Sequence, residues 1–151
     1  MRSLDISGID AWEAVVDPGS PPWVAVWLGG ILQAYRTGDL DWVIERTHPE
    51  VEIVQPPEFP DPRTYRGIEG LIDALLDWPS EWEDFRVEPR RVFAVDDQRA
   101  AVIGVHRGRS LTMGIEVEAE IVWLFTLEDG RTRRWDMFMS LDSALKAAES
   151  R

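Results

Sequence analysis

The stretch from Arg99 to Leu127 constrains the fold more than any other, because two β-rich runs flank the glycine-bearing turn Gly108 to Gly114. Apolar residues dominate the first run and alternate with glutamates on the second: Ala100, Val102, Ile103 and Val105, then Ile115, Glu116, Val117, Glu118, Glu120, Ile121, Trp123 and Phe125. A period of two is typical of strands that bury one face. The stretch therefore predicts a β-hairpin.

A lone histidine, His106, lies near the end of the first run. With the turn centred near Met113, the numbers of partner residues sum to roughly 226, so His106 falls opposite or beside Glu120. An imidazole next to a carboxylate is a candidate acid/base pair, with His106 as the base and Glu120 orienting it. The alternative is structural: a partly buried histidine bonded to a strand neighbour, and glutamates that form a solvated or dimer-facing strip.

The composition fits one acidic domain. The chain has 151 residues, 44% of them hydrophobic, and a formal net charge of −12. That charge repels phosphate backbones and anionic lipid, so we expect no nucleic-acid and no membrane partner. The absence of cysteine excludes disulfides and thiolate chemistry. Since no apolar run reaches the length of a signal peptide core or a membrane span, we expect a cytoplasmic protein.

No metal or cofactor is expected either. The two histidines, His48 and His106, are separated by a proline-rich loop, and no HxH, HExxH or EF-hand spacing occurs. Gly29 and Gly30 form a pair that we interpret as permitting close helix packing. No strand-to-helix loop precedes them, so a phosphate-binding role is disfavoured.

Turn-forming residues divide the chain into an N-terminal extension, residues 1–20, and one domain, residues 21–151. Apolar spacings of three and four predict helices over 24–35 and 68–78, with a short helix over 40–44 that ends at His48 and Pro49. Strands are expected over 51–55, 86–95 and 131–140 besides the hairpin, and a helix over 142–148. Four prolines, Pro56, Pro57, Pro60 and Pro62, are expected to forbid regular structure until Gly67.

This order of elements predicts an α+β fold. Four consecutive strands favour a curved, mostly antiparallel sheet, and the helices are expected on one face of it. Three helices over a curved sheet form a cone, closed at the narrow end and open at the other. The open end is where a small-molecule pocket is expected.

Several segments resemble the SnoaL-like, polyketide cyclase-like branch of the nuclear transport factor 2-like superfamily, a cystatin-like roll. They are Gly38-Asp39-Leu40-Asp41, His48-Pro49-Glu50-Val51-Glu52, Tyr65-Arg66-Gly67-Ile68-Glu69-Gly70, His106-Arg107-Gly108-Arg109, Gly114-Ile115-Glu116-Val117-Glu118-Ala119, Glu128-Asp129-Gly130 and Ser143-Ala144-Leu145-Lys146-Ala147-Ala148. The likeness covers residues 23–148 and implies the same α+β cone, usually as a homodimer.

The superfamily hosts isomerases, cyclases, epoxide hydrolases and non-catalytic binders, so the fold does not choose among them. By similarity, Gln55 stands where ketosteroid isomerases have their aspartate base, and it cannot ionise. The epoxide hydrolase triad is also absent, because its positions correspond to His106, Gly104 and Met137. Polyketide cyclases of the SnoaL type resemble this chain more, with a histidine and an acidic residue in the hairpin, as in His106 and Glu120.

We therefore predict an enzyme that isomerises, cyclises or hydrates an apolar cyclic molecule, or alternatively a non-catalytic binding or dimerisation module. The residues expected to contact the ligand are Gln55, Trp27, Ile31, Tyr65, Trp78, Ala119, Ile121, Trp123 and Met137. Gln55 has a second reading, as an amide that satisfies nearby backbone. Asp136 is expected to face outward if Trp135 and Met137 face the pocket. A homodimer is expected on the sheet face away from the helices, because strands that are apolar on both faces need a second cover.

Overall fold

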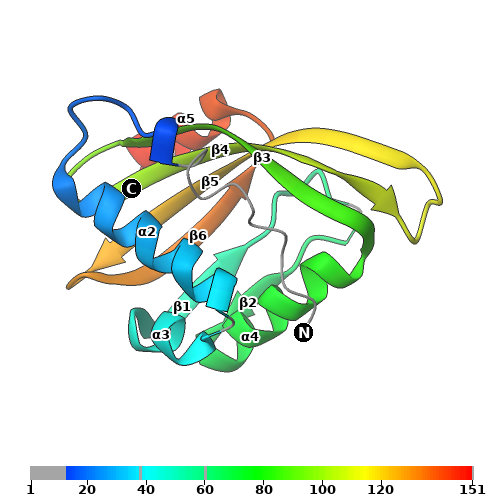
Figure 1. The fold of residues 1–151 in the computed structure, drawn as a ribbon, viewed down its shortest axis with the longest axis horizontal. Coiled ribbons are helices and arrows are strands. Elements are labelled where there is room, and N and C mark those ends of the chain that lie inside the picture. Colours follow the sequence, from blue (N-terminus) through cyan, green and yellow to red (C-terminus); the bar gives the residue numbers. More distant parts are fainter. Residues whose placement is uncertain (1–12, 38, 60, 151) are drawn as a thin grey trace.

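The computed structural model describes residues 13–37, 39–59 and 61–150, and the side chains of these residues except 31–37, 78 and 79. One curved sheet has the strand order β2-β1-β6-β5-β4-β3 (Figure 1). Neighbouring strands pair antiparallel, except that β1 and β6 are parallel. The strands are β1 (Thr47–Val54), β2 (Thr64–Arg66), β3 (Trp82–Ala94), β4 (Arg99–Ser110), β5 (Glu116–Glu128) and β6 (Arg131–Phe138). This confirms the predicted α+β fold with its hairpin.

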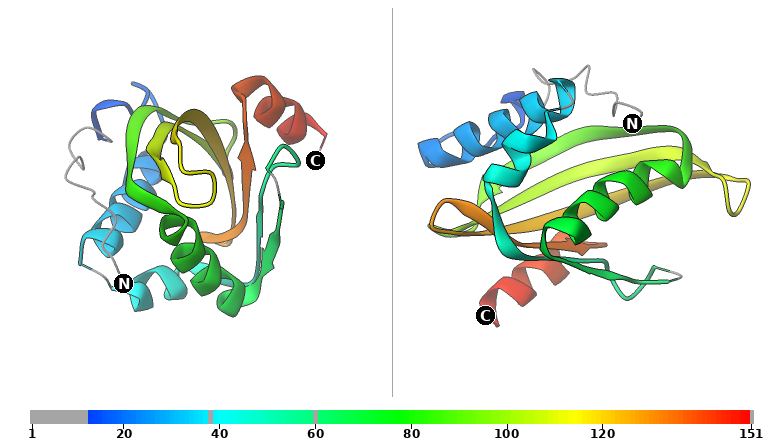
Figure 2. Two further views of the ribbon diagram at one scale, coloured as in Figure 1. Left: turned by 90° about the vertical axis from the view of Figure 1, so that its right-hand side faces the viewer. Right: turned by 90° about the horizontal axis from the view of Figure 1, so that it is seen from below.

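The helices lie on both faces of the sheet. They are α2 (Pro22–Thr37), α3 (Leu40–Glu45), α4 (Gly67–Ser80) and α5 (Leu141–Glu149). Figure 2 shows α2 and α4 over the concave side and α5 on the opposite side. We call the side under α2 and α4 the inner face and the other the outer face. The expectation that all helices share one face is therefore wrong for α5, whose Ala144 packs with Ile103 and Val122 on the outer face.

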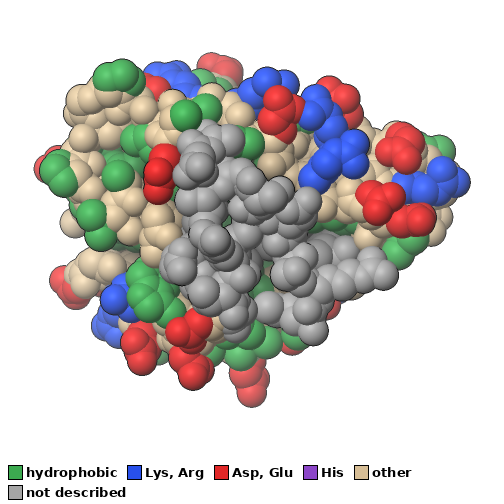
Figure 3. Space-filling model, in the orientation of Figure 1, with side chains coloured by type: hydrophobic (Ala, Val, Ile, Leu, Met, Phe, Trp, Pro, Cys, Tyr) green, Lys and Arg blue, Asp and Glu red, His purple; other side chains and the backbone are tan. Residues whose placement is uncertain are grey.

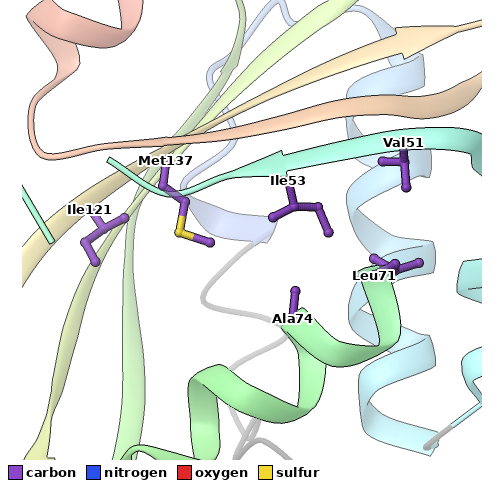
Figure 4. Close-up of a cluster of buried hydrophobic side chains, with 6 residues drawn as sticks. All are labelled: Val51, Ile53, Leu71, Ala74, Ile121 and Met137. Carbon is purple, nitrogen blue, oxygen red and sulfur yellow. The ribbon is translucent and has the colours of Figure 1, made fainter. Parts of the chain in front are cut away.

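Two apolar clusters join the helices to the inner face. Val24 and Leu28 of α2 pack with Val92, Val102 and Phe125 of the sheet. The second cluster brings α4 onto β1, β5 and β6 (Figure 4), and its buried members are Val51, Ile53, Leu71, Ala74, Ile121 and Met137. These side chains leave water on folding, which holds the sheet curved around the helices.

The glycine pair in α2 accommodates α3. A Cβ atom at Gly30 would lie 1.9 Å from Cη2 of Trp42, whereas a Cβ atom at Gly29 would meet nothing within 4 Å. The guanidinium of Arg46 also lies over this indole, 3.8 Å from the centroid of the Trp42 ring. The expected role in close helix packing is thus confirmed at Gly30, where an indole replaces the missing side chain.

Strand β3 bends over the end of the sheet because its ladder is interrupted twice. The register shifts between Glu83 and Arg86 and again between Pro89 and Arg91. At the first shift Asp84 has a φ of 54°, in the left-handed region. Bulges of this kind bend a strand and increase its twist. The bend carries the start of β3 across the concave side.

Three details differ from the sequence prediction or extend it. His48 lies within β1 and not at a helix end, because β1 already begins at Thr47. A short strand, β2, follows the prolines and pairs Tyr65 with Ile53, since Thr64 to Arg66 keep their backbone N–H groups. The segment before residue 20 contacts the domain: the backbone N–H of Asp17 donates to Val92 at 2.8 Å.

Among the described helices, none is long and apolar enough to cross a bilayer.

Candidate functional site

The hairpin register decides which side chains reach the inner face. His106 pairs with Ala119, while Glu120 pairs with Val105. His106 and Ala119 therefore share the inner face, and Glu120 is exposed on the outer face. The predicted pairing of His106 with Glu120 is wrong by one residue, and a slip of one residue moves a side chain to the other side of a sheet.

His106 is buried among aromatic rings. Its exposed fraction is 2%, and its ring centroid lies 5.5 Å from that of Phe85 and 4.9 Å from that of Trp123. Burial lowers the pKa of His106 from 6.5 to about 4, because the charged imidazolium is disfavoured away from water. The ring is thus neutral at neutral pH. A neutral imidazole carries one donor and one acceptor nitrogen and can take up a proton from a neighbouring molecule.

The rings around His106 continue across the inner face. Edge-to-face, tilted and stacked contacts at centroid distances of 4.7 to 6.0 Å link neighbouring rings into one aromatic cluster. From one end to the other, its members are Trp82, Phe85, His106, Trp123, Trp135, Phe125 and Trp27. Such contacts fix ring orientations beyond what area burial gives. The cluster presents a preorganised apolar surface with one titratable member.

Three indoles of this cluster carry buried N–H groups that have no acceptor among the described residues. They belong to Trp27, Trp123 and Trp135. A buried donor left without an acceptor costs about 1–3 kcal/mol, and native proteins keep few of them. Polar atoms of this kind beside an apolar surface can bind a ligand that supplies the acceptor.

The predicted ligand-contact residues fall into two groups. Ile121 and Met137 lie in the second apolar cluster (Figure 4), and Trp123 packs against it. Trp27 packs against the first cluster and Ala119 lies opposite His106, so these predicted residues converge on the inner face. The side chains of Ile31 and Trp78 lie outside the described part of the chain.

Tyr65 and Gln55 are engaged with other protein groups. The Tyr65 hydroxyl donates to Oδ2 of Asp77 at 3.2 Å, and burial followed by the Asp77 charge raises the pKa of Tyr65. The phenol therefore stays protonated. Oε1 of Gln55 accepts from the backbone N–H of Arg63 at 3.1 Å, which is the backbone-satisfying role considered for this amide.

A polar group forms around Tyr65 where β2 faces the end of α4. Nη1 of Arg63 lies 3.6 Å from Oδ2 of Asp77, and burial raises the pKa of the nearby Glu81. No group of three or more histidine or acidic side chains in the described ranges is placed to hold a metal ion. The titratable group set into the aromatic cluster is thus His106.

The predicted site residues did not include four members of the aromatic cluster: Trp82, Phe85, Phe125 and Trp135. Phe125 shares the inner-face alternation of Trp123, which could have identified it. Phe85 could not be found this way, because it follows the left-handed Asp84 inside a bulge that breaks the period of two.

Charges gather on the outer face. Arg107 pairs with Glu88 and with Glu118, and Figure 3 shows acidic and basic side chains together over the end of the molecule formed by β3, β4 and β5. Asp136 faces outward, opposite to Trp135 and Met137, and both of its oxygens lie 3.0 Å from Nε of Arg134. The carboxylates on this side are separated from His106 by the sheet.

The curved, unclosed sheet with α2, α3 and α4 over its concave side is the architecture of nuclear transport factor 2-like proteins. The model of the SnoaL-like domain family matches residues 30–135, more than half of the chain. The chain belongs to this family, which confirms the resemblance found in its sequence.

Solved structures agree on the fold. A nuclear transport factor 2-like protein from Burkholderia xenovorans LB400 has a TM-score of 0.66 at 22% identity, over 87% of this chain and 98% of that one. TerC, co-crystallised with polyporic acid, has a TM-score of 0.61 at 21% identity, over 85% and 99%. A protein from Jannaschia sp. CCS1 that bears the name of a SnoaL-like polyketide cyclase has a TM-score of 0.63 at 19% identity, over 89% and 99%. No curated protein matches the sequence.

Proposed function

We propose that this chain binds an apolar cyclic small molecule against the aromatic cluster of the inner face, and that His106 exchanges a proton with it. The observation that carries the proposal is the placement of one buried, neutral imidazole between Phe85 and Trp123. Flat aromatic surfaces of this kind bind ring systems by stacking and area burial. Membership of the SnoaL-like family supports a small-molecule or cyclase-type role.

In the proposed reaction, His106 acts as general base. Its acceptor nitrogen removes a proton from carbon or oxygen of the bound ring, and the resulting imidazolium returns the proton at a second position. An isomerisation or cyclisation needs no other co-reactant, because atoms and electrons balance within the substrate. Burial lowers the pKa of His106 to about 4, so its imidazolium is a stronger acid than a solvent-exposed one and favours return of the proton.

A second candidate is ligand binding without catalysis. The observation favouring it is the register, which places Glu120 on the outer face and leaves His106 beside Phe85 and Trp123 without that carboxylate. The two functions share the binding site and differ in whether His106 transfers a proton.

Binding is measured first, by quenching of tryptophan emission with steroid-like and anthraquinone-like compounds and with polyporic acid, with which TerC was co-crystallised. Proton transfer is then followed by NMR, as exchange of ring protons of the bound compound for deuterium. If wild-type protein binds a compound and His106→Gln abolishes exchange while keeping its affinity, the catalytic proposal is supported. Binding without exchange in wild-type protein supports the second candidate, and no binding of any ring compound rejects both.

A homodimer on the outer face remains part of the proposal. The homodimer was predicted because residues such as Ile103 and Val122 make the outer face apolar. In the structure, α5 of the same chain packs against these two residues. The family resemblance supports the dimer, and light scattering tests it.

A further inference from the structure

Strand β5 extends beyond the strand β6 that pairs with it, which leaves part of one edge without a partner. The ladder between β5 and β6 begins at Val122, paired with Phe138, whereas the ladder between β5 and β4 continues to Glu116. Figure 1 shows the hairpin continuing past the end of β6. In the described part of the chain, no strand pairs with the other side of Glu116–Ile121. We call this side the open edge, and such an edge is a template for an additional strand.

The hydrogen bonds of the hairpin fix which backbone groups reach the open edge. The N–H of Ser110 donates to the carbonyl of Ile115 at 2.9 Å. In an antiparallel ladder, successive residues direct their backbone groups to opposite sides. The odd-numbered residues on this part of β5 therefore bond to β4. Glu116, Glu118 and Glu120 direct their N–H and C=O groups to the open edge.

The side chains along the open edge are acidic on one face of the sheet and apolar on the other. The three glutamates are exposed on the outer face, while Val117 and Ala119 are half-buried on the inner face. Among the ion pairs of the described residues, one involves these glutamates: Nε of Arg107 lies 3.4 Å from Oε2 of Glu118. An added strand would meet a negatively charged row on one side and an apolar row on the other.

The turn that ends the hairpin exposes three large apolar side chains. Leu111, Met113 and Ile115 are 59%, 56% and 54% exposed. Contiguous exposed apolar surface marks interaction sites, unlike singly exposed residues. The tip of the hairpin thus adds an apolar contact next to the open edge.

Charge decides which kind of strand fits. A second copy of this chain that paired with the open edge in the antiparallel sense would place its own glutamates directly opposite these, and like charges in that position destabilise a sheet. The formal net charge of −12 adds repulsion between copies at longer range. A strand with lysine or arginine at every second position instead places cations opposite the glutamates. Apolar side chains between them would contact Val117 and Ala119.

We propose that the open edge binds an extended segment of another protein, in which basic and apolar residues alternate, by antiparallel strand addition. Backbone hydrogen bonds to the three glutamates supply affinity, and the alternating side chains supply specificity. This surface is separate from the aromatic cluster, so the proposal does not depend on the small-molecule function.

The probe is a fluorescein-labelled heptapeptide of alternating lysine and valine, with lysine at both ends, and its binding to the full chain is followed by fluorescence anisotropy at low salt. A peptide with glutamate in place of lysine should bind at least about tenfold more weakly. The combined variant Glu116→Gln, Glu118→Gln and Glu120→Gln should weaken binding of the lysine peptide by about tenfold, since it removes three cross-strand charge pairs. Circular dichroism checks that the variant is folded.

The matched control neutralises three other exposed glutamates, with Glu58→Gln, Glu69→Gln and Glu149→Gln in one chain. It has the same net charge as the first variant and should bind the lysine peptide like wild-type protein. An equal loss of affinity in the two variants would show attraction by net charge alone and overturn the proposal.

Methylated peptides test the backbone pairing. In the proposed pairing, the lysines opposite the glutamates direct their N–H groups to β5 and the valines direct theirs away. Methylation of the lysine backbone nitrogens should abolish binding, and methylation of the valine nitrogens should preserve it. Equal affinities of the two methylated peptides would overturn strand addition.

Amide hydrogen exchange, measured by NMR, tests whether the edge is open. In wild-type protein alone, the N–H groups of Glu116, Glu118 and Glu120 should exchange fast and those of Val117 and Ala119 slowly. The lysine peptide should slow exchange at the glutamates. Slow exchange there without peptide would show that the edge is already occupied, by a second copy if it depends on protein concentration, and would overturn the proposal. Failure of the folded protein to bind the lysine peptide would overturn it as well.

Discussion

The burial of His106 has a measurable consequence for stability. In the folded protein burial lowers the pKa of His106 to about 4, from an ordinary value of 6.5. Between these values the unfolded chain binds a proton at this position and the folded chain does not. Protonation therefore favours unfolding: the contribution of His106 is fully present above pH 6.5 and is lost as the pH falls toward 4.

The size of the effect follows from the two pKa values. A difference of 2.5 pH units between 6.5 and 4 corresponds to about 3 kcal/mol over the whole range. From pH 7 to pH 5 the same linkage gives a loss of about 2 kcal/mol. That is a large share of the stability of a domain of this size.

Urea denaturation at pH 7, 6 and 5, followed by circular dichroism, measures how the free energy of unfolding depends on pH. Carboxylates also titrate in acid, so the informative quantity is the difference between wild-type protein and His106→Gln at each pH. This difference should change by about 2 kcal/mol between pH 7 and 5. The same comparison in a His48→Gln background removes the other histidine and should give the same change. A difference that stays constant with pH would show that His106 is solvated, and it would remove the basis for a neutral base in the aromatic cluster.

Three further predictions concern Gly30, His106 and the oligomeric state. Gly30→Ala should be less stable than Gly29→Ala by about 1–3 kcal/mol in urea unfolding, because only the first substitution places a Cβ atom in the ring of Trp42. Equal stabilities of the two variants would contradict the contact between Gly30 and Trp42. His106→Ala should abolish turnover while keeping ligand affinity within about tenfold, since a general base acts on the chemical step, and full turnover in a kinetic assay would make the residue structural. Light scattering at micromolar concentration should show a dimer, and a monomer would refute that proposal.

The alternation of apolar and polar residues was enough to predict the hairpin, and the helical spacing was enough to predict α2, α4 and α5, because burial on one side imposes these periods. Facing was harder. Gly114, with a φ of 68°, donates its N–H to the carbonyl of Ser110 at 2.7 Å, and the ladder begins with the pair Arg109 and Glu116. This turn is centred half a residue earlier than Met113. Half a residue in the turn is one residue in register, which moved the expected partner of His106 to the other face.

The sequence patterns did not show what covers the outer face of the hairpin, because that depends on tertiary packing. The outer face of the hairpin is apolar at Ile103 and Val122, and from sequence this predicted a second subunit as the cover. In the structure, the buried Ala144 of α5 provides it from within the chain. A short amphipathic helix gives no sign in its own sequence of which side of a sheet it will occupy. Its position depends on the loop after β6 and on the space that α2 and α4 already fill.

The site itself combines elements that no single sequence window contains. His106 comes from β4, Phe85 from a bulged stretch of β3, and Trp27 from α2, a helix near the start of the described chain. The hairpin register places Glu120 on the outer face, so the sheet separates its carboxylate from the imidazole of His106. The environment of His106 is therefore set by its burial and by the rings of Phe85 and Trp123 that contact it.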